Sequence, residues 1–194
     1  MKLLHLDTSA LGAHSVSREI SAAIVAQLRQ DGAATSVTYR DLATDALPHW
    51  QPSGDDASEA ARQDAGVLQQ FLDADIVVIG APMYNFGIPS QLKAWIDRVL
   101  VAGQTFRYGP NGPEGLAGGK RVIVASARGG IYSEGPAAGM DFQESYLRTA
   151  FGFIGIGDVE FIRAEGVAMG DEARQRGVQS AHASINGLAV PKAA

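Results

Sequence analysis

The chain of 194 residues has room for one domain with a sizeable core, and its 46% hydrophobic and 19% charged residues are ordinary for a globular protein. A net charge of -5, with no basic run interleaved with aromatic residues, argues against nucleic-acid binding. The lack of cysteine excludes disulfides, thiolate metal sites and thiol redox catalysis.

Five short apolar or β-branched runs alternate with five helical patterns along the chain. Strands are expected at residues 3–7, 35–39, 76–80, 121–126 and 159–163. Helices are expected at residues 15–30, 59–72, 90–101, 141–153 and 171–188. This alternation predicts an α/β fold, a doubly wound five-stranded parallel sheet with the flavodoxin-like order 2-1-3-4-5, in a single domain spanning residues 1–194.

Three details complete the expected fold. The alternating Val37 and Tyr39 indicate that the second strand lies at an edge of the sheet. Residues 42–58 are rich in Pro, Gly and Asp and are expected to form a loop, while residues 105–108 before Asn111-Gly112 predict a local hairpin. Ala173, Val178, Ala181 and Ile185 are expected on the inner side of the last helix.

The segment from Ala81 to Pro89 is the most informative stretch of the chain. It joins the buried third strand to a helix whose apolar stripe is formed by Leu92, Trp95, Ile96 and Val99. Open α/β sheets bind ligands at the carboxyl ends of their strands, and Tyr84, Asn85 and Phe86 offer flat or polar groups there. We interpret it as a ligand loop; the alternative is an ordinary turn whose aromatic side chains enter the core.

Two more loops are expected at the same edge of the sheet. Residues 8–17 place several hydroxyls before a helix that Ser15 or Ser17 can cap, which suits a terminal phosphate, although they can also form a simple serine cap. In residues 126–132, Gly129 and Gly130 allow backbone amides to approach a flat ring, with help from Arg128, although paired glycines also make ordinary turns. A phosphate end, a stacking middle and a polar ring edge together match FMN.

Other candidate motifs are weaker. The chain has no G-x-G-x-x-G after its first strand, and Gly118-Gly119-Lys120 lacks the spacing of a nucleotide triphosphate loop and reads as a turn. His5 is expected in the core and His14 in solvent, and His49 and His182 lack neighbours at metal-ligand spacing, so no metal site is predicted. We expect a solvated loop at Asp55, Asp56 and Glu59, and exposed helix pairs among Asp141, Glu144 and Arg148.

The string Met83-Tyr84-Asn85-Phe86 with Gln91-Leu92-Lys93 resembles the flavin loop of the FMN-dependent NADH azoreductases, also called NADH:quinone oxidoreductases. The resemblance extends over nearly the whole chain and includes Phe106-Arg107-Tyr108, residues 111–116 and residues 153–156. It implies a homodimer with one FMN per subunit, NADH as electron donor with NADPH as the alternative, and a quinone or azo compound as acceptor.

The resemblance also implies which residues bind. The phosphate would be surrounded by Ser9, Ser15, Val16 and Ser17. The flavin ring would be lined by Met83, Tyr84, Asn85, Phe86, Ala127, Arg128, Gly129 and Gly130. Tyr108 and Phe153 match positions that reach the partner's pocket. The flavin carries the chemistry, so no catalytic residue is required; protons are expected from solvent or, alternatively, from Tyr132 at the rim.

Two departures from the family pattern bear on the pocket. Ala127 stands where relatives often have Ser, and Val16 replaces a commonly polar residue, so both contribute backbone groups rather than side chains. The loop at residues 42–58 also looks shorter than in several relatives. The acceptor is therefore the least determined feature.

Two other classes of protein remain as alternatives. A flavodoxin-like electron carrier would bind FMN without turning over nicotinamide, and a scaffold protein of the same fold would bind no flavin. No apolar run approaches a membrane span and the N-terminal apolar stretch is too short for a signal peptide, so a cytoplasmic location is expected.

Overall fold

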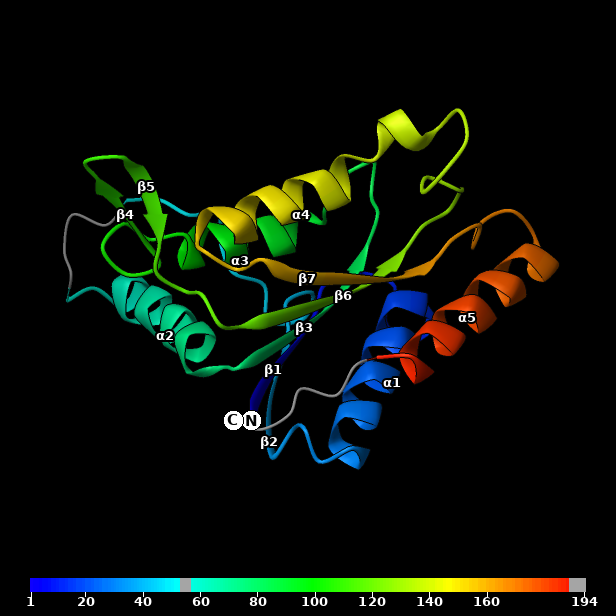
Figure 1. The fold of residues 1–194 in the computed structure, drawn as a ribbon, viewed down its shortest axis with the longest axis horizontal. Coiled ribbons are helices and arrows are strands. Elements are labelled where there is room, and N and C mark those ends of the chain that lie inside the picture. Colours follow the sequence, from blue (N-terminus) through cyan, green and yellow to red (C-terminus); the bar gives the residue numbers. More distant parts are fainter. Residues whose placement is uncertain (53–56, 189–194) are drawn as a thin grey trace.

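The computed structural model describes residues 1–52 and 57–188. A five-stranded parallel sheet lies at its centre, with the order β2-β1-β3-β6-β7 (Figure 1). The strands are β1 (Lys2–Asp7), β2 (Ser36–Asp41), β3 (Ile76–Pro82), β6 (Arg121–Ala127) and β7 (Asp158–Ala164). Counted within this sheet the order is 2-1-3-4-5, which confirms both the predicted topology and the edge position of the second strand.

Helices cover both faces of the sheet. α1 (Val16–Gln30) and α5 (Asp171–Asn186) pack on one face, and α2 (Glu59–Asp73), α3 (Ser90–Val99) and α4 (Phe142–Phe153) on the other (Figure 1). The central strands β3 and β6 are buried along their whole length, as their continuous apolar sequences require.

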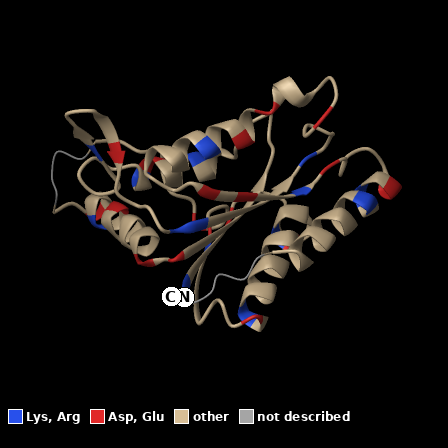
Figure 2. Cartoon of the chain, viewed as in Figure 1, with Lys and Arg blue, Asp and Glu red and all other residues tan. Residues whose placement is uncertain are grey.

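Smaller elements complete the fold. The predicted hairpin is present as β4 (Phe106–Gly109) paired antiparallel with β5 (Gly112–Gly115). Short 3₁₀ turns occur at η1 (Gly12–His14) and η2 (Ala138–Met140). In the view of Figure 2, Lys and Arg residues of the described chain are interspersed with Asp and Glu.

Several boundaries differ from the predicted ones. β3 and β6 run on to Pro82 and Ala127, which pair with each other, so the sheet reaches the first residues of the predicted ligand loops. α3 ends at Val99 rather than at residue 101. On α5, Ala181 and Ile185 are buried but Ala173 and Val178 are only half-buried. Asp55 and Asp56 of the expected solvated loop lie outside the described residues.

Candidate functional site

The loops after β1, β3 and β6 leave the sheet at one edge, because these strands are parallel neighbours. Backbone hydrogen bonds join the start of the first loop to β3 and the start of the second loop to the end of β6. The Thr8 amide donates to the Gly80 carbonyl at 3.1 Å, and the Met83 amide donates to the Ala127 carbonyl at 2.8 Å. The three segments singled out from the sequence therefore form one surface, which we call the loop rim (residues 8–17, 83–89 and 127–132).

The first loop ends in a cap for α1. Ser15 is the N-cap residue, and its Oγ accepts a hydrogen bond from the Arg18 amide at 3.3 Å. The Ser15 and Ser17 hydroxyls lie 3.0 Å apart, and both side chains are buried, as is Ser9. The first-turn amides of a helix have no acceptor within it, and the helix dipole favours negative charge at this end. This loop therefore has the chemistry of an anion site.

Tyr84 connects the first loop to the second. Its phenol oxygen lies 3.3 Å from Ser9 Oγ and accepts a hydrogen bond from the Ala10 amide at 3.2 Å. The Leu11 amide in turn donates to Ser9 Oγ at 3.2 Å. The predicted phosphate loop and the predicted ring loop are thus held together by one side chain.

The second loop contains a strained turn. The amides and carbonyls of Tyr84 and Gly87 exchange two hydrogen bonds of 3.0 Å, and Asn85 and Phe86 between them have φ angles of +47° and +70°. Asn tolerates this conformation, whereas a bulky Phe rarely adopts it. Such strain costs on the order of 1 kcal/mol or more and is concentrated at functional sites. Phe86 is 40% exposed, so the turn presents its ring at the surface.

The third loop is held by the segment that follows β7. The Gly129 and Gly130 carbonyls accept hydrogen bonds from the Ala168 amide at 3.1 Å and the Gly166 amide at 3.0 Å. Within the described part of the chain, the amides of Gly129 and Gly130 donate to no acceptor. These two donors are available to a ligand that lies against the glycines.

The surroundings of Arg128 contradict the prediction that its side chain helps to hold the flavin ring. The guanidinium is fully buried: Nε donates to Ser126 Oγ at 2.9 Å, and the other nitrogens pair with Glu144 at 2.5 Å, Asp141 at 3.0 Å and Glu165 at 3.3 Å. A group so enclosed cannot assist a flavin at the rim, and that prediction was wrong. Only the backbone of Arg128 remains a candidate for contact with a ring.

Glu144 pairs with Arg148 at 3.6 Å one turn along α4, as the spacing predicted, but the predicted exposure of Glu144 was wrong. It is 9% exposed and accepts hydrogen bonds from Arg163 Nε at 2.5 Å and Arg163 Nη2 at 2.8 Å. Burial alone would raise the pKa of Glu144, but Arg163 and Arg128 outweigh it and hold this pKa below its ordinary value. The Glu165 pKa is also lowered, since hydrogen bonds from Ser133 and Tyr132 and the charge of Arg128 overcome burial.

The predicted substrate residues are divided between two places. The Tyr132 ring contacts Phe86 edge-on at 6.2 Å between centroids, so it belongs to the loop rim. The Phe153 ring packs on Phe106 at 4.7 Å, beside Tyr108. α4 separates the two groups: it starts at Phe142, whose amide bonds to the Phe86 carbonyl, and is about 18 Å long. Within this single chain, Tyr108 and Phe153 therefore do not face the rim.

The remaining candidates have structural roles. His5 is buried and bonds Ser21 Oγ at 3.0 Å, as expected for a core histidine, and Lys120 Nζ donates to the Leu72 and Ala74 carbonyls at the end of α2. Among the described residues, no group of three or more His, Cys, Asp or Glu side chains could hold a metal. No helix in that part of the chain is long and apolar enough to cross a membrane.

Comparison with known proteins decides the family. The model of the flavodoxin-like fold matches residues 1–188. An FMN-dependent NADH:quinone oxidoreductase 1 of Xanthomonas axonopodis pv. citri (strain 306) is 58% identical over 189 residues, covering 96% of each chain. The chain belongs to the FMN-dependent NADH:quinone oxidoreductases. The predicted resemblance is confirmed.

Other members of the family also match this chain over nearly its whole length. The FMN-dependent NADH:quinone oxidoreductase of Rhizobium meliloti (strain 1021) is 55% identical over 196 residues, with 95% of each chain covered. The azoreductase AzrA superposes with a TM-score of 0.84 at 31% identity, covering 97% of this chain and all of AzrA. An FMN-dependent NADH-azoreductase of Bacillus anthracis str. Ames Ancestor, solved in complex with FMN, gives 0.82 at 26% identity, covering 96% of this chain and 99% of its own.

Proposed function

We propose that the protein binds FMN at the loop rim and uses it to transfer two electrons from NADH to a quinone or azo acceptor. The observation that carries the proposal is that the Tyr84 phenol contacts Ser9 and Ala10. It thereby links the anion-binding loop (residues 8–17) to the ring loop (residues 83–89) in one site. The names of the relatives at 52–59% identity supply the reaction class.

The donors of the rim fit the parts of FMN. The hydroxyls of Ser9, Ser15 and Ser17, with the amides of Val16 and Ser17, would hold the phosphate. The flat ring would lie among Met83, Tyr84, Asn85, Phe86, Ala127, Gly129 and Gly130, where the two glycine amides can donate to its polar edge.

When bound, FMN supplies the capacity to accept a hydride from NADH and to pass two electrons to an acceptor. The protein's own groups bind and orient it. The strained turn fixes the Asn85 amide and the Phe86 ring at the surface, and Tyr132 adds a phenol beside them from which a proton can be donated. No further acid or base is needed in this scheme.

The proposal is tested by mixing the purified protein with FMN, NADH and a soluble quinone and following NADH oxidation by its absorbance. One site that serves both substrates in turn predicts ping-pong kinetics with parallel double-reciprocal lines. Flavin binding without NADH oxidation would indicate an electron carrier instead. A protein that stays colourless with added FMN would indicate a scaffold.

Replacing Asn85 with Gly is expected to slow flavin reduction by NADH while FMN remains bound. Glycine adopts a φ of +47° without strain, so the turn survives and only the amide is lost. Asn85→Ala would add strain at the same position and confuse the two effects. Stopped-flow reduction at saturating FMN measures the rate, and a parental rate would make Asn85 a turn residue only.

A homodimer is the second part of the proposal. An apolar groove of about 590 Å³ lies beside the ring loop, lined by Gly87, Ile88, Lys93, Phe142, Ser145, Tyr146 and Thr149. Phe142 is 61% exposed there, and Tyr108 on the distant hairpin is 75% exposed. A second copy related by two-fold symmetry would cover apolar surface and bring a Tyr108 and a Phe153 toward each rim.

Tyr108→Ala is expected to raise the KM for the quinone about five- to tenfold, the effect of losing one aromatic contact, with FMN affinity unchanged. Phe153→Ala is a poorer probe because that ring also packs on Phe106. Arg107→Ala changes the same hairpin without removing an aromatic group and serves as the control. Light scattering gives the mass of the active species, and full activity at the mass of one chain would exclude a shared site.

A further inference from the structure

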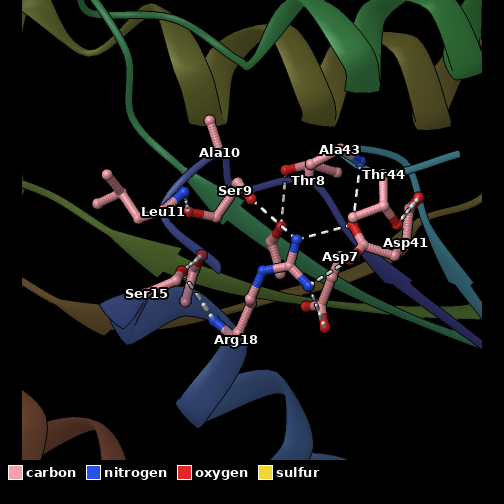
Figure 3. A network of polar contacts seen from close by, with 12 residues as sticks. Asp7, Thr8, Ser9, Ala10, Leu11, Ser15, Arg18, Asp41, Ala43 and Thr44 are labelled. Carbon is pink, nitrogen blue, oxygen red and sulfur yellow. Dashed lines mark hydrogen bonds and ion pairs between the residues drawn. The ribbon is translucent and has the colours of Figure 1, made fainter. Parts of the chain in front are cut away.

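The guanidinium of Arg18 connects α1 to the ends of two strands (Figure 3). Its two terminal nitrogens donate hydrogen bonds to the Asp41 carboxylate at 2.7 and 2.8 Å, and Nη2 also donates to the Ser9 carbonyl at 2.9 Å. Nη1 donates to Tyr39 at 3.3 Å and lies 3.7 Å from Asp7. One side chain from the first turn of the helix therefore fixes the backbone of the loop that precedes it.

The charge of Arg18 is already balanced. The hydrogen bond from Arg18 outweighs burial and lowers the pKa of Asp41, so the pair stays ionised across the neutral range. Asp41 is itself held by the Ala43 amide at 3.0 Å. Because the guanidinium faces a carboxylate and a carbonyl, it acts on this loop by geometry rather than as a free positive charge.

Ser9 is held from both sides. Arg18 fixes its carbonyl, while its hydroxyl meets the Tyr84 phenol and receives the Leu11 amide. Ser9 is fully buried, so it has little freedom to recover this position if either support is lost. A substitution of Arg18 is therefore expected first to displace Ser9, which belongs to the anion-binding loop (residues 8–17).

We propose that Arg18 is a positioning residue that presets the phosphate loop for FMN, acting through the Ser9 carbonyl and anchored by Asp41. The proposal rests on the proposed function, since it assumes that the loop receives the FMN phosphate. It adds a residue that contacts the ligand only through another.

The test compares FMN with riboflavin, which has the same ring and no phosphate. Flavin-free protein is titrated with each by fluorescence quenching. Arg18→Met is expected to weaken FMN binding about tenfold, the effect of one charge-assisted hydrogen bond, and to leave riboflavin binding unchanged. General loosening of the fold would not separate the two ligands. Arg29→Met, in the exposed last turn of α1, is the control and should change neither affinity.

Two further variants separate position from charge. Arg18→Lys keeps the charge but loses the planar fork, so it should weaken FMN binding like Arg18→Met. Asp41→Asn removes the anchor and should also weaken it. Unchanged FMN affinity in Arg18→Lys, or stronger FMN binding in Asp41→Asn, would assign Arg18 a direct electrostatic role and overturn the proposal.

The wild-type protein separates this inference from the function on which it rests. Binding of neither flavin by the wild type would overturn the proposed function. A wild type that prefers FMN, with the same preference kept in Arg18→Met, would overturn the role of Arg18 alone.

Discussion

Replacing Arg128 with Met is expected to lower the free energy of unfolding by about 3–5 kcal/mol, because a buried charge cluster loses one partner. Arg128 is fully buried among Glu144, Glu165 and Asp141. Within the described residues, only Glu144 of these three carboxylates pairs with further arginines, Arg163 at 2.5 Å and Arg148 at 3.6 Å. Urea denaturation measures the loss. FMN should still bind to the folded variant at low temperature, since the side chain does not face the loop rim.

A matched control is available on α5. Arg176 pairs with Glu172 at 3.6 Å one turn away, with both side chains mostly exposed. Arg176→Met should cost at most about 1 kcal/mol, as for other surface pairs. Equal losses in the two variants would show that the Arg128 cluster contributes no more than a surface pair.

Acid titration of stability adds a second readout for Arg128. The pKa values of Glu144 and Glu165 are lowered from 4.5 in the folded chain. Their stabilisation is therefore complete above the unfolded value and is lost as the pH falls through the lowered folded values. Without Arg128 both pKa values move upward, so the variant should lose less stability on acidification than the wild type. If the variant and the wild type lose the same amount of stability on acidification, Arg128 is not coupled to these carboxylates.

The sequence predicted the sheet well because the hydrophobic pattern of each strand and helix lies within a short stretch of the chain. Buried parallel strands need unbroken β-branched runs, and the helices between them need one apolar stripe. From the strand order, the meeting of the three loops follows geometrically, as the Met83 to Ala127 hydrogen bond confirms. What the pattern missed at the boundaries was the extension of β3 and β6 into those loops, since Pro82 and Ala127 carry no strong strand signal.

The charged side chains were predicted less well because their partners are distant in sequence. Spacing alone placed Glu144 on an exposed helix face, whereas it is buried and pairs with Arg128, which follows β6, and with Arg163 on β7. Arg18 gave no signal at all, since Asp41 is 23 residues away. The strain at Phe86 is likewise invisible in composition, although an Asn at the preceding position is the residue most tolerant of such a turn.

Ser17→Ala is expected to weaken FMN binding about ten- to a hundredfold, because hydrogen bonds to charged groups contribute roughly 1.5–3 kcal/mol each. Ser17 is 1% exposed and lies in the first turn of α1, 3.0 Å from the Ser15 hydroxyl. Its loss would leave the phosphate short of one donor in a place where water cannot easily replace it. The dissociation constant is measured by titrating flavin-free protein with FMN.

Turnover separates the phosphate end from the ring in this variant. At saturating FMN, kcat should be nearly parental, since the ring loop and its Tyr84 bridge are untouched. Ser184→Ala, an exposed hydroxyl near the end of α5, is the control and should leave FMN affinity as it is. Parental FMN affinity in Ser17→Ala would move the phosphate away from the N-terminus of α1. A fall in kcat at full FMN occupancy would instead mean that the phosphate loop and the ring loop act as one unit. In that case Tyr84→Phe, which removes the hydroxyl that joins the two loops, should show the same fall in kcat.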